Sequence, residues 1–194
     1  MCNLYRLEKN PDAIRRLFAD AGIQLGFPEG IPNLIPTDVR ITDRAPIVRS
    51  GPRGAELVVR RWSWPNAGGK PLYNLKSDGR SFSERRCLAV ADGFYEFTAP
   101  ADPKAKRKDR WLFQPVEGDL IGIAAIWRDH PAVGEAFTLL TGLPGEDVQP
   151  YHHRQIVLVP PARWADWLNP KVPSAELLQA TPPGFLRVEA APAP

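Results

Sequence analysis

The sequence predicts an α+β fold: a single domain with a curved, mainly antiparallel, barrel-like β core and a few flanking helices. Three observations predict it. The 194 residues suit one compact domain. Most strand-like runs follow one another without a crossover helix between them, which favours antiparallel pairing. Proline is abundant, with 22 residues spread along the chain, so turns are frequent. We expect the domain to span residues 1–189 and a disordered tail to occupy 190–194.

Two segments have the pattern of helices. Residues 10–22 begin with a capping Asn10 and with Pro11 in the first turn, and Gly22 can end the helix. Residues 161–170 place two tryptophans and a leucine on one face. Between these helices, short runs bounded by Pro, Gly or Asp are typical of strands. These runs are residues 38–42, 56–62, 87–97, 119–127, 136–141 and 155–160.

Composition excludes several classes of protein. No apolar run approaches the roughly 20 residues of a membrane helix. Residues 1–22 lack the plan of a signal peptide, and Cys2 and Cys87 have no metal-ligand spacing, so we expect a cytoplasmic protein with reduced thiols. The net charge of +3 favours polyanions only weakly. The basic segment 98–110 lies among helix-breaking residues and predicts a mobile loop.

Cys2 stands directly behind the initiator methionine. Removal of that methionine would leave an α-amine, with an ordinary pKa of about 7.7–8.0, beside a thiol with an ordinary pKa of about 8.5. With an aldehyde, the amine forms a Schiff base and the sulfur closes a thiazolidine ring. Position alone favours the simpler alternative, in which Cys2 is a second residue that has no role.

Glu96 lies in the run 87–97, where alternation places it on one face with Val90, Asp92 and Phe94. A carboxyl group among apolar side chains has a raised pKa, which suits proton transfer near neutrality. The alternative is a strand-end glutamate tilted into water.

His152 and His153 precede the last strand-like run. Adjacent strand residues point to opposite faces, so we expect at most one of them to face any pocket. That histidine could act as an acid or base, or could simply lie at the surface. Two neighbours on opposite faces make no zinc site.

Tryptophans and cations alternate further along the chain. Rings that stack on bases and cations that follow phosphates are what single-stranded nucleic acid needs, although strand tryptophans also pack in cores. The residues in question are Arg60, Trp62 and Trp64 on one strand face, then Asn74, Lys76 and Arg80.

Taken in order, these segments resemble the SRAP (SOS response-associated peptidase) family, whose members crosslink to abasic sites in single-stranded DNA. The most specific block is "RRCLAVADGFYEF" at 85–97, and the resemblance covers residues 2 to about 160. It also rests on Met1-Cys2, "PNLIPT" at 32–37, "RWSWP" at 61–65, "YNLKSD" at 73–78, "FTLLT" at 137–141 and "HHR" at 152–154.

The resemblance implies a curved antiparallel β core with a positively charged channel. It implies that Cys2 is the nucleophile and thiazolidine former, that Asn74 positions the linkage, that Glu96 is the acid/base group, and that His152 assists at the sugar. It assigns DNA contacts to Trp62 (or Trp64), Lys76, Arg80, Arg85, Arg154 and Thr141. Lys76 stands where the family usually has arginine. The forked guanidinium of arginine is thus replaced by the ammonium of lysine, which acts as a point charge.

The function implied is covalent capture of abasic sites in single-stranded DNA, which shields them from cleavage during the DNA damage response. We expect a monomer without metal, cofactor or membrane, associated with the nucleoid at damage. One alternative is an N-terminal-nucleophile peptidase or amidohydrolase that uses Cys2. Another is a non-catalytic nucleic-acid binder that relies on the 98–110 loop and the tryptophans.

Overall fold

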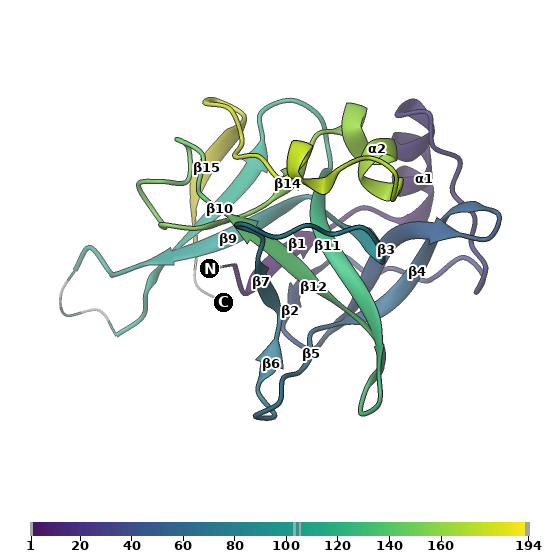
Figure 1. Ribbon diagram of the computed structural model, residues 1–194. Helices are drawn as coiled ribbons and strands as arrows, with labels where there is room; N and C mark the ends of the chain where they lie inside the picture. The colour runs from purple at the N-terminus through teal and green to yellow at the C-terminus, as the bar shows by residue number, and fades with distance from the viewer. Residues whose placement is uncertain (1, 103, 105, 193–194) are drawn as a thin grey trace.

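Two curved β-sheets make up most of the protein in a computed structural model that describes residues 2–102, 104 and 106–192 (Figure 1). The first sheet is antiparallel throughout and has the order β15-β10-β9-β1-β2. Its strands are β1 (Leu4–Leu7), β2 (Thr37–Arg40), β9 (Gly93–Thr98), β10 (Asp109–Pro115) and β15 (Leu186–Ala191).

The second sheet closes on itself. Its order is β13-β12-β4-β3-β8-β11-β14, and a further pairing of β12 with β11 joins β12, β4, β3, β8 and β11 into a ring. Pairings are antiparallel except that β12 runs parallel to β4 and to β7. The strands are β3 (Arg44–Gly51), β4 (Gly54–Trp62), β7 (Asn74–Lys76), β8 (Arg86–Ala91), β11 (Ile121–His130), β12 (Gly134–Gly142), β13 (Gln155–Ile156) and β14 (Leu158–Val159), with a separate hairpin of β5 (Trp64–Pro65) and β6 (Pro71–Leu72). The expected barrel-like, mainly antiparallel core is confirmed.

The helices form where the sequence predicts them. In α1 (Pro11–Asp20) the Asn10 side chain accepts a hydrogen bond of 2.8 Å from the Ala13 amide. Helix α2 (Trp164–Leu168) follows a 3₁₀ turn (Pro161–Arg163), and a second 3₁₀ turn spans Ser174–Glu176. The rings of Phe18 and Trp164 stack with centroids 4.3 Å apart, so the two helices cover the same end of the barrel (Figure 1).

The predicted strand 87–97 is two strands, because the chain leaves one sheet and enters the other at Asp92. The Asp92 carboxylate accepts hydrogen bonds from the Glu8 and Lys9 amides, which fixes the break. A side chain at Gly93 would have its Cβ 2.6 Å from the Phe113 carbonyl oxygen, so glycine is needed there. The face that Glu96 occupies is therefore set by β9 alone.

The domain extends past the expected boundary at residue 189. Strand β15 pairs with β10 as far as Ala191, opposite Arg110. Of the predicted tail 190–194, residues 193 and 194 lie outside the described part of the chain. Neither helix in the described ranges has the length or apolar content that crossing a bilayer takes.

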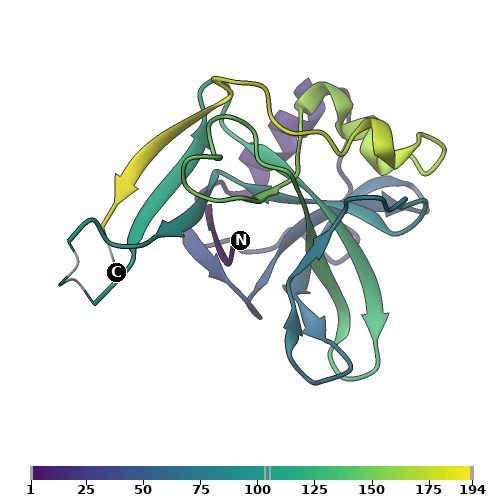
Figure 2. The ribbon, with the colours of Figure 1, turned by 60° about the vertical axis from the view of Figure 1, so that its left-hand side comes forward.

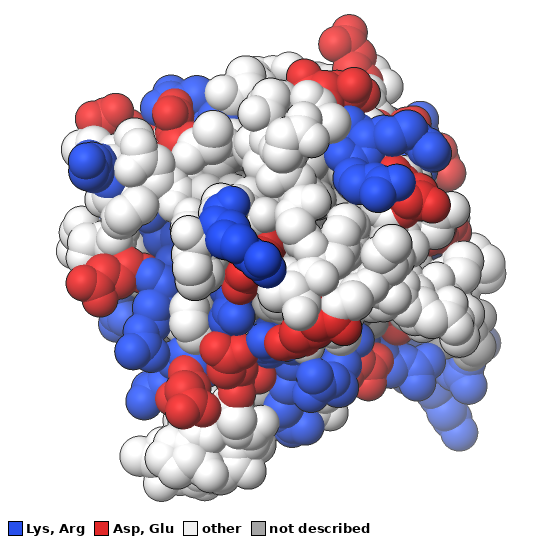
Figure 3. Space-filling view, turned by 90° about the vertical axis from the view of Figure 1, so that its right-hand side faces the viewer, with Lys and Arg blue, Asp and Glu red and all other residues white. Residues whose placement is uncertain are grey.

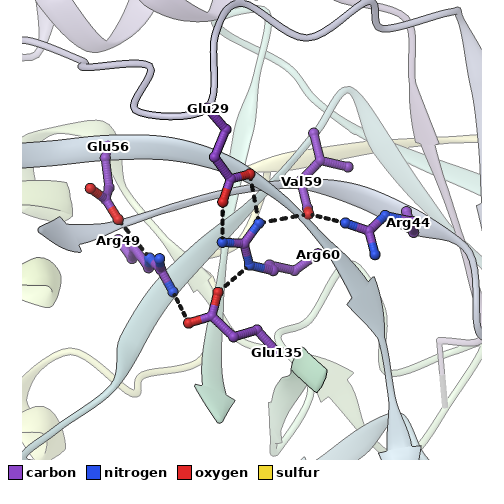
Figure 4. A network of polar contacts seen from close by, with 7 residues as sticks. All are labelled: Glu29, Arg44, Arg49, Glu56, Val59, Arg60 and Glu135. Atoms are coloured by element: carbon purple, nitrogen blue, oxygen red, sulfur yellow. Dashed lines mark hydrogen bonds and ion pairs between the residues drawn. The ribbon is translucent and has the colours of Figure 1, made fainter. Parts of the chain in front are cut away.

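Arg60 belongs to an ion-pair network on the barrel wall (Figure 4). Its buried guanidinium donates to both carboxylate oxygens of Glu29, at 2.6 and 2.9 Å, and to Glu135 at 2.5 Å. Arg49 joins Glu135 to Glu56 in the same network. The nucleic-acid contact considered for Arg60 is therefore wrong, because its donors are already paired inside the protein.

Replacing Arg60 with methionine is expected to destabilise the fold by about 2–3 kcal/mol, because it leaves two carboxylates without their shared cation. For a domain of this size the midpoint of thermal unfolding should fall by roughly 5–10 °C. Arg44→Met is the matched control, since Arg44 is exposed and, among the described residues, donates to the Val59 carbonyl rather than to a carboxylate. Equal melting temperatures for the two variants would contradict a stabilising network.

Charges alternate in sign on the face turned away from the N-terminus. Figure 3 shows basic and acidic side chains side by side there, without a continuous positive surface. The N-terminus comes to the middle of the view when the left-hand side of Figure 1 is brought forward (Figure 2). The face in Figure 3 thus lacks the continuous positive charge that would favour binding of a polyanion.

Candidate functional site

The chain N-terminal to β1 runs beside β9. The antiparallel register pairs Tyr5 with Phe94, so the residues before β1 continue toward Glu96 and Phe97. Cys2 is fully buried there, and its thiol donates to the Leu4 carbonyl oxygen at 3.3 Å.

Cys2 is held from both sides of its backbone. The Asn74 side-chain amide donates to the Cys2 carbonyl oxygen at 2.6 Å, and the Cys2 amide donates to the Glu96 carboxylate. Asn74 reaches this position because β7 pairs with β12, with Asn74 opposite Leu139. The structure thus brings together three residues that are 72 and 22 positions apart in sequence.

Asn74 has a second polar atom at this point. Its side-chain oxygen is buried and has no hydrogen-bond partner among the described residues. A buried acceptor without a partner is costly, so it is suited to a donor that arrives with a ligand or with a new amine.

Glu96 is only 1% exposed. Burial raises its pKa to about 7, although the hydrogen bond from the Cys2 amide acts in the opposite direction. Both protonation states are therefore populated near neutral pH, as a group that both gives and takes protons requires.

The Cys2 thiol is protonated at neutral pH. Burial raises its pKa well above the ordinary range, and the nearby charge of Glu96 adds to the effect. A reaction at this sulfur therefore needs a base close by, and the Glu96 carboxylate is near enough to act on the thiol electrostatically.

A cavity of about 350 Å³ opens beside these groups and is lined by Asn3, Glu96, Phe97, Lys108 and His152. It joins two residues that the sequence had singled out, Glu96 and His152. The sequence placed Lys108 only in a basic loop, because the pattern gave no sign that Lys108 lines a cavity together with Glu96. Lys108 directly precedes β10, and β10 pairs with β9, the strand of Glu96. That pairing could have indicated that Lys108 lies near Glu96.

His152 and His153 do not point to opposite faces as expected. Their rings stack with centroids 4.5 Å apart at an interplanar angle of 21°. The rule of alternation fails because both residues lie in a turn before β13, where the His152 amide donates to the Val148 carbonyl. Burial lowers the pKa of His152, with further lowering by the neighbouring His153 and Lys108, so this histidine is neutral at physiological pH.

The tryptophans proposed to stack on bases lie in the interior. Trp62 is fully buried and donates from its ring nitrogen to the Tyr73 carbonyl at 2.9 Å. Its ring packs on Tyr5 at a centroid distance of 5.1 Å. Trp64, the alternative, is buried as well. Neither ring is open to a base in this structure, so the core-packing interpretation is the one that the burial supports.

Thr141 and Arg154 are buried together. The Arg154 guanidinium donates to the Thr141 carbonyl oxygen at 2.7 Å and pairs with Asp78 at 2.5 Å. The Arg154 amide also lies 3.0 Å from Nδ1 of His152. Arg154 therefore connects the turn of His152 to β12 and to the loop after β7. Most of its hydrogen-bond donors are thus used inside the protein.

The other predicted DNA-contacting cations are exposed. Lys76 ends β7, and Arg80 lies in the loop after it. Arg85 precedes β8 with its guanidinium 5.6 Å from the centre of the Trp127 ring. None of the three lines the cavity at Glu96. In the described part of the chain no cluster of three His, Cys, Asp or Glu residues could hold a metal ion.

A family model described as SOS response associated peptidase (SRAP) matches residues 1–190. The chain belongs to the SRAP family. Two curated relatives, both named abasic site processing protein YoqW, come from Bacillus subtilis strain 168 and Bacillus phage SPbeta. Each is 28% identical to this SRAP chain over 119 residues, a match that covers 59% of this chain and 52% of the relative. The chain thus spans about half the length of the curated relatives it matches.

Solved structures share the fold of this SRAP chain. A protein from Bordetella bronchiseptica has a TM-score of 0.75 at 19% identity, with 99% of this chain and 100% of that chain covered. A protein from Bacteroides thetaiotaomicron has a TM-score of 0.74 at 17% identity, with 97% of this chain and 91% of that chain covered. At such low identity the likeness concerns the fold alone.

Proposed function

We propose that this SRAP protein captures abasic sites in single-stranded DNA by forming a thiazolidine between Cys2, freed of Met1, and the ring-opened aldehyde. The observation that carries the proposal is the pair of hydrogen bonds that hold the Cys2 backbone beside a cavity. The Cys2 amide donates to Glu96, and the Cys2 carbonyl accepts from Asn74. The names of the curated relatives, which process abasic sites, agree with it.

The capture reaction needs two bonds at one carbon. The α-amine of Cys2 adds to the aldehyde carbon, and loss of one water gives an imine. The sulfur then adds to the same carbon, and the thiol proton ends on the nitrogen. The net change is loss of one water, without an oxidant or a metal.

Each neighbouring residue has a task in this sequence. Glu96 in its acid form protonates the departing hydroxyl, and in its ionised form it takes the thiol proton. Neutral His152, in the same cavity, accepts the proton of the anomeric hydroxyl as the C–O bond of the ring breaks, and gives it to the ring oxygen, so that the aldehyde forms without a net change in protons. Asn74 fixes the Cys2 backbone, and its unpaired oxygen receives the new amine.

A second activity, removal of Met1 by the protein itself, is favoured by the same hydrogen bond. The Cys2 nitrogen that contacts Glu96 is the leaving nitrogen of the bond between residues 1 and 2. Water adds to the carbonyl carbon, the C–N bond breaks, and Glu96 supplies the proton to the amine. In cell-free synthesis without aminopeptidase, the wild-type chain should lose Met1 and Glu96→Gln should keep it; retention by both would rule self-processing out.

The direct experiment is intact-mass measurement before and after incubation with an abasic single-stranded oligonucleotide. We expect loss of Met1 and a one-to-one adduct that is smaller than the sum of its parts by one water. An oligonucleotide with a tetrahydrofuran residue, which cannot open to an aldehyde, is the matched probe. Adduct formation with the tetrahydrofuran probe, or none with the abasic one, would contradict the proposal.

Lys108→Gln is expected to raise the oligonucleotide concentration needed for half-maximal capture roughly fivefold, because Lys108 is the cation among the described residues that line the cavity. The dependence of log affinity on log salt should become shallower by about 0.7, the value for one phosphate on a single strand. Lys106→Gln, in the same loop but outside the cavity, is the control. A similar change in both variants would mean that the loop acts only by its overall charge.

A further inference from the structure

A second cleft, of about 560 Å³, lies on the other side of Arg154 from the reactive cavity. Three segments line it: residues 77–81 after β7, Gly142 and Leu143 after β12, and residues 175–180 near the second 3₁₀ turn. The Phe82 amide donates to the Ser174 hydroxyl, which joins the first and third segments, and Figures 1 and 2 both show them side by side. The resemblance assigns a DNA contact to Arg80, which lines this cleft, but the capture chemistry proposed above uses none of the lining residues.

Arg154 links the cleft to the reactive cavity. Arg154 contacts His152 of the cavity through its amide and Asp78 of the cleft through its guanidinium. Strand β7 connects them as well, because Asn74 at Cys2 and Ser77 at the cleft are three residues apart, a span of about 10 Å. This separation is within the reach of a nucleotide that lies next to an abasic site held at Cys2.

The lining suits a nucleotide. Leu143, which is 69% exposed, and Leu178 offer apolar surface to the face of a base. The Gln179 amide donates one hydrogen to the Ala175 carbonyl, which leaves its second hydrogen and its oxygen for the edge of the base. Exposed Lys76 and Arg80 stand at the same end of β7 to meet a phosphate. The one carboxylate of this wall, Asp78, is already paired with Arg154, which holds its pKa below the ordinary value. The volume lies within the range of small-molecule sites.

We propose that this cleft binds a nucleotide that flanks the abasic site, on one side of it only. The inference rests on the proposed capture function and adds a second subsite to it. A single strand then enters in one direction, with the lesion at Cys2 and a neighbouring base against Leu143 and Leu178.

Single-turnover capture of short abasic oligonucleotides tests this subsite. The probes carry the abasic residue with one, two or three nucleotides added on the 5′ side or on the 3′ side. Addition on one side should lower the half-saturating concentration roughly tenfold, and addition on the other side should change it little.

Ala180→Trp, which fills the cleft from its rim, should abolish that tenfold gain while leaving the rate at saturation within about twofold. Arg80→Gln should weaken binding of the longer probes and make their salt dependence shallower by about 0.7. Ala132→Trp, at an exposed turn between β11 and β12, is the control for an added tryptophan.

The outcomes separate the two proposals. If the wild-type protein captures every probe equally, or if Ala180→Trp keeps the full gain, the subsite is refuted while capture itself stands. If no probe of any length is captured, the capture function fails and the subsite fails with it.

Discussion

Replacing Glu96 with glutamine is expected to slow capture of an abasic oligonucleotide by about 10²–10⁴-fold, the usual range for loss of an acid/base group. Glutamine keeps the shape and can still accept the hydrogen bond of the Cys2 amide, but it cannot transfer a proton. The rate of the wild-type protein should change with pH around 7, where Glu96 titrates, and that inflection should be absent in the variant.

The same substitution is expected to stabilise the fold above neutral pH. The pKa of Glu96 is raised from 4.5 to about 7, so the folded state holds this proton more tightly than the unfolded chain. The contribution of this group to the free energy of unfolding is fully present below pH 4.5 and is lost as pH rises through 7. The loss is about 1.4 kcal/mol for each pH unit and about 3 kcal/mol in total. Glu96→Gln should therefore match the wild type at pH 4 and exceed it at pH 8.

Glu117→Gln is the control for both measurements, because Glu117 is exposed. Denaturant titrations at pH 4 and pH 8 read out stability, and single-turnover capture reads out rate. A Glu96→Gln variant that captures at the wild-type rate would remove Glu96 from the mechanism, whatever its stability.

Cys2→Ala is expected to eliminate any adduct that survives without a reductant. An N-terminal alanine still has an amine and can form an imine, but no sulfur is present to close the ring. The adduct of the variant should appear only when borohydride is added, and the wild-type adduct should need none. Denaturing gels with and without borohydride make the comparison.

Cys87→Ala is the matched control for the second thiol. Cys87 is fully buried in β8, and neither it nor its sequence neighbours line the cavity at Glu96, whereas Asn3, next to Cys2, does. Full adduct yield from Cys87→Ala and none from Cys2→Ala is the expected pair of results. If the yields were reversed, Cys2 would not be the reacting residue.

Much of the fold could be predicted because local chemistry agrees with the final structure. Asn10 and Pro11 begin α1 where capping rules place them, and the short strand runs pair antiparallel. The break at Asp92 could not be predicted, since its cause is distant: the amides of Glu8 and Lys9 bind the Asp92 carboxylate. A run of residues with strand composition does not reveal when it changes sheets.

The candidate site divides in a similar way. Burial of Glu96 follows from the apolar residues around it, and the structure agrees. Alternation could place Trp62 on a face but could not tell whether that face packs in the core or meets a base. The sequence therefore left both interpretations open, and the structure shows the ring packed on Tyr5. Lys108 and His152 line the same cavity although they are far apart in sequence, and no periodicity encodes such a contact.

The central claim is that both the nitrogen and the sulfur of Cys2 bond to the sugar. Tandem mass spectrometry of the trypsin-digested adduct, prepared without a reductant, tests it through the peptide of residues 2–6. We predict that this peptide begins at Cys2, carries the sugar remnant and resists alkylation by iodoacetamide. A remnant on Lys108 or another lysine, or on a peptide that still begins with Met1, would contradict the account.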